Sequence, residues 1–276
     1  TGAEASPEAV VETALEAPEP LAGMQGRARR IVSYHNFQST PALGPILKRL
    51  EKTPADVWKL VTTARRPSDN LRVLEAARRP HRRPLVVLAM GEMGAPSRVL
   101  SLAHQCAFTY AALSAQAGAT APGQLPSRLL RRQYRADRHS ADTAVYGVIA
   151  DPVGHSISPA VHNRAFQARR VDAVYVPFQV EERQLGDFFR LAAGLPVAGF
   201  SVTIPHKQKV LRHLDAVDAQ ARRIGAVNTV YRKQGRLRGT NTDILGVTGP
   251  LGKRLKLKGS RILVIGNGGA ARGAAF

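Results

Sequence analysis

The chain has 276 residues, of which 44% are hydrophobic, and its formal net charge at pH 7 is +20. No apolar run approaches the ~20 residues of a membrane span, and the N-terminus lacks a secretory signal pattern. A single cysteine, Cys106, excludes an internal disulfide framework and favours a reducing compartment, which we take to be the cytoplasm.

The positive charge is compatible with nucleic-acid binding or with an enzyme that binds anionic substrates. The basic residues are scattered in pairs such as Arg65-Arg66 and Arg222-Arg223, without interleaved aromatic residues. Helix-turn-helix and zinc-finger spacings are absent as well. The pattern therefore favours an anionic small molecule over a specific nucleic acid, and the spacing of histidines, cysteines and carboxylates predicts no metal site.

The first half of the chain predicts βα units around a parallel sheet. Residues 1–29 are rich in Ala, Glu and Pro, and we expect them to be helical or disordered. Short apolar runs then alternate with helical patterns, as parallel sheets require. The predicted strands are 30–34, 57–63 and 84–90, and the predicted helices are 40–52, 68–79 and 96–105. A polar, aperiodic stretch follows, and we predict a linker at 136–144.

The second half predicts another α/β unit, beginning near Val145. Its predicted strands are 145–149, 173–178, 198–204, 226–232, 236–240 and 261–265. Its predicted helices begin at Ser158, cover 181–193, begin at Pro205, and cover 216–223 and 246–255. A helix that begins at Pro205 would place Lys207 in its first turn.

Five short motifs punctuate this second unit: HSISP (155–159), SVTIPHK (201–207), GAVNT (225–229), GTNTD (239–243) and GNGGAAR (266–272). The first four supply hydroxyl, amide, ammonium and carboxylate groups, which can grip a polyhydroxylated acid and move a proton. The fifth matches a G-x-G-x-x-A turn between a predicted strand and helix, a pattern that can hold a dinucleotide. Glycine turns also occur there for steric reasons alone.

These motifs resemble shikimate dehydrogenase over residues 145–276. The resemblance implies a substrate-binding domain at 145–243 and the truncated start of an NADP-binding Rossmann domain at 244–276. Lys207 and Asp243 would be the catalytic pair. The implied substrate-binding residues are Ser156, Ser158, Thr203, Asn228 and Thr242. The implied cofactor-binding residues are Gly266, Gly268, Gly269, Ala270 and Ala271. Ser201 stands where that family often has Asn, and a surface salt bridge is the alternative interpretation of Lys207 and Asp243.

Lys59 lies inside the apolar run VWKLVTT, where its neighbours would desolvate it and favour a nucleophilic amine. An edge-strand lysine that opposes aggregation is the alternative from the strand alone. Residues 30–135 resemble the C-terminal half of type I 3-dehydroquinate dehydratase, on the strings SYHNF, DVWKLVTTA, MGEMGAPSR and ATAPGQ. The resemblance implies a partial TIM-type barrel with Lys59 as the imine-forming amine and His35 as the acid/base. The implied substrate-binding residues are Arg98, Gln124 and Thr120.

The two resemblances fit together because the dehydratase product is the dehydrogenase substrate. We therefore predict part of a bifunctional enzyme that dehydrates 3-dehydroquinate and reduces 3-dehydroshikimate to shikimate with NADP. We expect weak activity or none from the chain as it stands. The alternatives are a catalytically silent sensor of the same metabolites and a quinate/shikimate dehydrogenase.

Overall fold

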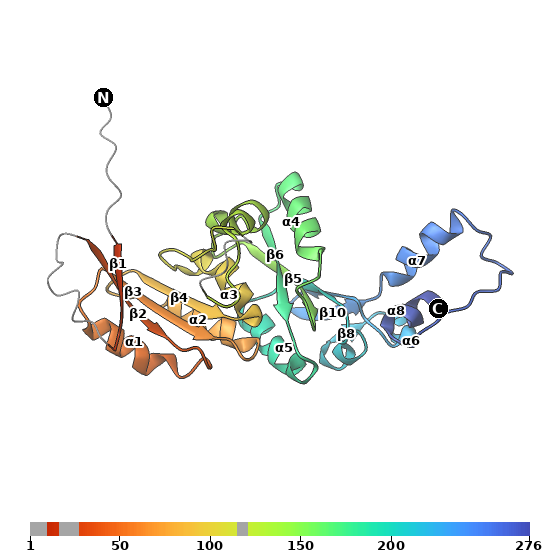
Figure 1. The fold of residues 1–276 in the computed structure, drawn as a ribbon. Helices are drawn as coiled ribbons and strands as arrows, with labels where there is room; N and C mark the ends of the chain where they lie inside the picture. Colours follow the sequence, from red (N-terminus) through yellow and green to blue (C-terminus); the bar gives the residue numbers. More distant parts are fainter. Residues whose placement is uncertain (1–9, 17–27, 115–120) are drawn as a thin grey trace, which may run out of the picture. The chain divides into compact units, whose positions relative to one another are not determined.

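The computed structural model describes residues 10–16, 28–114 and 121–276. The chain divides between Thr143 and Ala144 into two compact units, each an α/β structure with its own sheet (Figure 1). The predicted α/β class is confirmed for both units.

The first unit contains a four-stranded parallel sheet in the order β1-β2-β3-β4. The strands are β1 (Val10–Ala14), β2 (Arg29–His35), β3 (Val57–Thr63) and β4 (Leu85–Met90). The helices are α1 (Leu43–Lys52), α2 (Ser68–Arg78) and α3 (Ala95–Leu100), and a π-helix, η4, covers Leu129–Tyr134. Short 3₁₀ turns are η2 (Glu92–Gly94), η3 (Leu102–His104) and η5 (Ala136–Arg138). The described strands form an open sheet, so closure into a barrel stays a prediction.

Both faces of this sheet are covered, which explains why β3 and β4 read as continuous apolar runs. Every residue of β4 is buried, and so are the first six residues of β3. On one face Ile31, Val57, Val86 and Leu88 form a cluster, against which Phe108 and Tyr110 pack. Lys59 is the buried charge on β3.

The expectation that residues 1–29 are helical or disordered is wrong for Val10–Ala14. These residues form β1, which pairs in parallel with β2 from Val10–Arg29 to Ala14–Ser33. The β-branched residues of VVETA favour a strand, and pairing with β2 satisfies the backbone groups that an isolated short helix would leave exposed. The remaining positions 1–9 and 17–27 lie outside the described residues.

The second unit contains a six-stranded mixed sheet in the order β6-β5-β7-β9-β10-β8. The strands are β5 (Ala144–Ala150), β6 (Ala173–Gln179), β7 (Gly199–Val202), β8 (Ala216–Val217), β9 (Thr229–Lys233) and β10 (Arg236–Thr240). The helices are α4 (Ser158–Arg169), α5 (Leu185–Gly194), α6 (Ala219–Ile224), α7 (Asp243–Gly252) and α8 (Gly269–Ala275). Short 3₁₀ turns are η6 (Glu182–Gln184) and η7 (Lys209–His213).

The predicted hairpin around Gly235 is confirmed, since β9 and β10 pair antiparallel from Thr229–Thr240 to Lys233–Arg236. Its two turn residues, Gln234 and Gly235, both have positive φ angles, 53° and 77°. This is the backbone form of the two-residue turns that match strand twist.

The helix predicted to begin at Pro205 does not form. Residues 204–208 are turns, and a 3₁₀ segment, η7, follows them. The carbonyl of Lys207 accepts a hydrogen bond from the backbone N–H of Val227 at 2.8 Å, so it is not available to an α-helix. Lys207 is therefore held by a turn that packs against the segment before β9.

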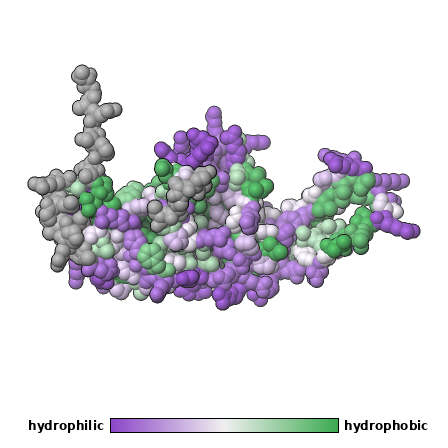
Figure 2. Space-filling view, viewed as in Figure 1, coloured by the Kyte–Doolittle hydropathy of each residue, from purple (hydrophilic) through white to green (hydrophobic). Residues whose placement is uncertain are grey.

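The strand predicted at 261–265 is also absent. The apolar side chains there are exposed, with Leu263 at 84% and Ile265 at 90% of their full accessibility, and Figure 2 shows apolar surface along this part of the chain. None of the described residues pairs with this segment, and an isolated strand cannot satisfy its own backbone groups. Of the strand, glycine turn and helix predicted after residue 260, the structure therefore shows the turn and α8 without the strand.

Candidate active sites

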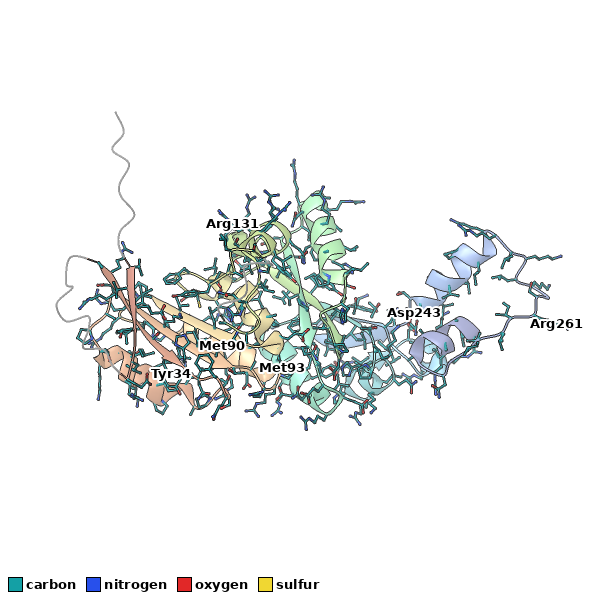
Figure 3. All side chains as sticks on the ribbon, in the orientation of Figure 1. Tyr34, Met90, Met93, Arg131, Asp243 and Arg261 are labelled. Carbon is teal, nitrogen blue, oxygen red and sulfur yellow. The ribbon has the colours of Figure 1, made fainter. Side chains whose placement is uncertain are left out.

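In the second unit Lys207 and Asp243 lie in contact, with 2.6 Å between Nζ and Oδ2. Both are partly buried, their side chains being 17% and 24% exposed. Asp243 is the first residue of α7, where the positive end of the helix dipole favours a carboxylate. Figure 3 labels Asp243 at this position.

Asn228 holds the second oxygen of the same carboxylate. Its Nδ2 donates to Asp243 Oδ1 at 2.7 Å and to Thr242 Oγ1 at 3.0 Å. The backbone N–H of Thr242 donates to Asn228 Oδ1 at 3.0 Å, and so does the Thr229 hydroxyl, at 2.8 Å. The backbone N–H of Asp243 donates to Asn241 Oδ1 at 2.9 Å. The asparagine at 228 and the segment 241–243 thus form one network that fixes the carboxylate opposite Lys207.

The predicted serines lie around a buried tyrosine, Tyr175. Its hydroxyl donates to Ser201 Oγ at 2.7 Å and also hydrogen bonds with Ser158. Burial raises the pKa of this hydroxyl, against the opposing effect of those partners. The backbone N–H of Ser158 donates to Ser156 Oγ at 3.3 Å. Ser201 pairs with Thr229 across β7 and β9, which connects the serine group to Asn228.

The glycine turn lies beside Lys207. Gly268, Gly269 and Ala270 line a cavity of about 370 Å³ together with Thr203 and Lys207. A Cβ on Gly269 would lie 2.8 Å from Cβ of Lys207, so only glycine permits this approach. Gly266 has a φ angle of +129°, and Ala271 packs against it, at 3.5 Å from the position of its missing Cβ. The cavity therefore joins Thr203, Lys207 and the turn in one space.

In the first unit Lys59 is 7% exposed and has two partners that the sequence reasoning missed. Its Nζ donates to both oxygens of Glu12, at 2.8 and 3.1 Å, and lies 3.9 Å from the centre of the Tyr110 ring. The Tyr110 hydroxyl donates to Glu12 Oε2 at 3.0 Å. A charged residue inside the β-branched run VVETA was the available signal for Glu12.

His35 shares the Lys59 face of the sheet, because Ser33 pairs with Lys59 and His35 is two residues further along β2. Its ring stacks on Phe37 with centroids 5.9 Å apart. Burial lowers the pKa of His35, and the charge of Lys59 lowers it further. His35 is therefore neutral near pH 7 and able to accept a proton.

Arg98 is 1% exposed on α3, and burial lowers the pKa of its guanidinium to about 10. Its Nη2 donates to the carbonyl of Pro122 at 3.3 Å, while its Nε has no partner in the described part of the chain. Arg98 thus holds the 121–124 loop that carries Gln124. Thr120 lies outside the described residues.

Over residues 10–16, 28–114 and 121–276, no group of three or more His, Cys, Asp or Glu side chains is arranged to hold a metal ion. The helices in these ranges are all too short or too polar to cross a membrane.

Comparison with known proteins separates the chain into the same two parts. Residues 11–141 match the type I 3-dehydroquinase family, and residues 148–230 match the shikimate dehydrogenase substrate binding domain. A chloroplastic bifunctional 3-dehydroquinate dehydratase/shikimate dehydrogenase from Arabidopsis thaliana is 36% identical over 270 residues, covering 91% of this chain and 44% of the relative.

An NADP(+) shikimate dehydrogenase from Bacillus cereus is 48% identical over 134 residues, covering 48% of each chain. The crystal structure of shikimate dehydrogenase from Aquifex aeolicus is 39% identical over 49% of this chain and 51% of its own, with a TM-score of 0.47. The chain thus spans about half the length of the curated relatives it matches.

Proposed function

We propose that this chain acts on two successive metabolites, because its two parts match the type I 3-dehydroquinase family and the shikimate dehydrogenase substrate binding domain. The first unit dehydrates 3-dehydroquinate through an imine, and the second reduces the product, 3-dehydroshikimate, to shikimate with NADP. The Lys207–Asp243 contact of 2.6 Å carries the second proposal.

In the reduction, the Lys207 ammonium donates a proton to the substrate oxygen as the carbonyl becomes a hydroxyl. Asp243 accepts from Lys207 and keeps its ammonium directed, while Asn228 prevents the carboxylate from turning away. Ser156, Ser158, Thr203 and Thr242 bind the carboxylate and ring hydroxyls of the substrate. The reduced nicotinamide, when bound, supplies the hydride.

The residues of the glycine turn fit a dinucleotide. Gly268 has no heavy atom within 4 Å of the place where a Cβ would lie, and it borders the cavity that holds Lys207. The backbone of Gly266, Gly268 and Gly269, with Ala270 and Ala271, would hold the pyrophosphate.

In the dehydration, the neutral Lys59 amine attacks the ketone carbon, a C–N bond forms, and the carbonyl oxygen leaves as water. Elimination then removes a proton from the carbon beside the imine and the ring hydroxyl as a second water. Hydrolysis of the imine returns the ketone and frees Lys59. His35 moves the protons of imine formation and elimination. Its pKa is lowered, mainly by burial and further by the charge of Lys59, so the neutral ring can accept a proton. Arg98, Gln124 and Thr120 bind the substrate in this proposal.

The reduction is tested by mixing the chain with shikimate and NADP+ and following NADPH absorbance, together with calorimetry of shikimate binding. We expect shikimate to bind and any turnover to be weak, and we expect Lys207→Ala to abolish that turnover. Lys233→Ala, at an exposed position at the end of β9, should change neither quantity. A chain that binds no shikimate contradicts the proposal. Binding without turnover, unaffected by Lys207→Ala, supports the metabolite sensor instead, and preference for quinate supports a quinate/shikimate dehydrogenase.

A further inference from the structure

The nitrogen of Lys59 lies between an anion and an aromatic face. Both Glu12 oxygens contact it, at 2.8 and 3.1 Å, and the Tyr110 ring centre lies 3.9 Å away. The Tyr110 hydroxyl closes the group by donating to Glu12 at 3.0 Å. We call Glu12, Tyr110 and the Lys59 nitrogen between them the cation cage.

Strand register builds the cage. Ala14, Ser33 and Lys59 lie side by side across β1, β2 and β3, and Glu12 is two residues before Ala14, on the same face. Tyr110 packs on the apolar cluster of that face. On the other side of Lys59, β4 offers only apolar residues.

The protonation states suit a cage for a cation. Burial pushes the pKa of Glu12 upward, but the hydrogen bond and charge of Lys59, with the hydrogen bonds of Ser33 and Tyr110, lower this pKa overall. The carboxylate is therefore ionised at neutral pH. Burial and the charge of Glu12 raise the pKa of Tyr110, so its hydroxyl keeps the proton that it donates. His35 also lies near Lys59, and the charges that act on His35 include Glu12 and Glu16.

We infer that Glu12 and Tyr110 stabilise the two cationic states of the Lys59 nitrogen, the resting ammonium and the protonated imine. Between these states the ammonium gives a proton to the neutral His35, and the free amine attacks the ketone. The inference rests on the proposed imine chemistry of the first unit. Forming the imine from ammonium and ketone releases one water, and the nitrogen keeps one hydrogen and the positive charge. The two cationic states occupy the same position, so the contacts that favour one also favour the other.

This charge has a chemical purpose. A protonated imine withdraws electrons from the adjacent carbon far better than a neutral imine, and elimination next to it needs that withdrawal. A carboxylate in contact with the nitrogen disfavours loss of its proton. Glu12 is therefore a further catalytic residue, and Tyr110 positions it and presents its ring to the cation.

The test measures how the protonated imine depends on pH. The full chain is incubated with 3-dehydroquinate and cyanoborohydride, which reduces protonated imines selectively, and the adduct on Lys59 is quantified by peptide mass spectrometry. We expect trapping to fall at high pH as the imine loses its proton. Glu12→Gln should move that fall to lower pH by about 1–3 pH units, because an opposing charge in contact is removed.

Tyr110 separates the two parts of the cage. Tyr110→Phe keeps the ring and removes the hydroxyl, so it should shift the fall less than Tyr110→Leu, which removes both. Glu75→Gln on the exposed face of α2 makes the same chemical change as Glu12→Gln away from the cage, and it should leave the profile unchanged.

If the amount of trapped adduct falls at the same high pH in Glu12→Gln as in the wild type, and trapping at lower pH is normal, the role of the cation cage is wrong while the imine chemistry stands. If wild-type Lys59 forms no adduct, both the imine chemistry and the inference that rests on it are wrong. The signal from Lys59→Ala gives the background of the measurement. Far-ultraviolet circular dichroism of each variant confirms that it is folded.

Discussion

The two units each contain a lysine in contact with a carboxylate, but they build the pair differently. Lys207 and Asp243 lie on a turn and at the start of a helix, and Asn228 grips the free oxygen of the aspartate. Lys59 and Glu12 lie on strands, and the lysine contacts both glutamate oxygens at once. In the first arrangement the acid is fixed and the lysine faces a cavity; in the second the lysine is enclosed.

The difference corresponds to the chemistry that we propose for each lysine. A proton donor needs access to the substrate oxygen and must regain its proton from solvent after each turnover. Lys207 borders the cavity, and its side chain is 17% exposed. A lysine that becomes covalently bonded needs a surrounding suited to the charged product, and the Lys59 side chain is only 9% exposed. The carboxylate therefore orients a proton donor in one unit and stabilises a cation in the other.

The strongest way to break the comparison is Asp243→Asn. The amide keeps the size of the side chain but removes the charge that orients the Lys207 ammonium, so we expect turnover to fall by about 10²–10⁴-fold. The rate of shikimate oxidation with NADP+ measures the effect. Asp142→Asn, on an exposed turn of the first unit, should leave the rate unchanged, and an equal loss there would show that the effect is not specific.

The fold could be predicted from the sequence where the residues of an element themselves carry its pattern, without help from residues far along the chain. The apolar runs that became β3 and β4 are buried on both faces, and the hairpin around Gly235 carries its turn chemistry locally. The strand β1 was missed because VVETA is short and lies among Ala, Glu and Pro, and only its pairing with β2 makes it a strand. Conversely, the apolar run at 261–265 has strand composition but no described neighbour to pair with.

The candidate sites divide in the same way. Lys207 and Asp243 are 36 residues apart, and their contact followed from a motif resemblance rather than from any local pattern. Glu12 and Lys59 are 47 residues apart, and no motif pointed to Glu12, so their contact required the register of three strands. The first turn of a helix was wrongly expected at Lys207 because the hydrogen bond from Val227 to its carbonyl is a long-range contact.

Gly269→Ala tests whether the loop-built site depends on close backbone approach. The added Cβ would lie 2.8 and 2.9 Å from two carbons of Lys207, so we expect a loss of about 1–3 kcal/mol in the free energy of unfolding. Urea denaturation measures it. Gly246→Ala in α7 meets no heavy atom within 4 Å and should be neutral or stabilising. Equal stability of the two variants would contradict the packing of the turn on Lys207.

Tyr175→Phe tests whether the hydrogen bonds from Tyr175 orient Ser201 and Ser158 for binding shikimate. The change removes the hydroxyl that bonds Ser201 and Ser158 but keeps the buried ring. Losing such a bond costs about 1 kcal/mol, so the dissociation constant for shikimate should rise by about fivefold. Calorimetry measures it, with Tyr231→Phe on the exposed face of β9 as the control. Unchanged affinity would mean that the tyrosine serves packing alone.

The smallest effect concerns acid stability and distinguishes the enclosed pair from a surface ion pair. The pKa of Glu12 in the folded chain lies below its ordinary value of 4.5: burial raises it, and the contacts with Lys59, Ser33 and Tyr110 together lower it by more. Between the lowered pKa and 4.5 the unfolded chain binds more protons, so the stability due to Glu12 is complete above 4.5 and is lost as the pH falls through the folded pKa.

Glu12→Gln lacks this contribution, so the unfolding free energies of the two proteins should converge on acidification. Because the Glu12 side chain is 32% exposed, we expect the difference above 4.5 to stay below about 1 kcal/mol. Denaturation at a series of pH values measures it, with Glu75→Gln as the control. A constant difference across the series would contradict the ionised Glu12 on which the cation cage depends.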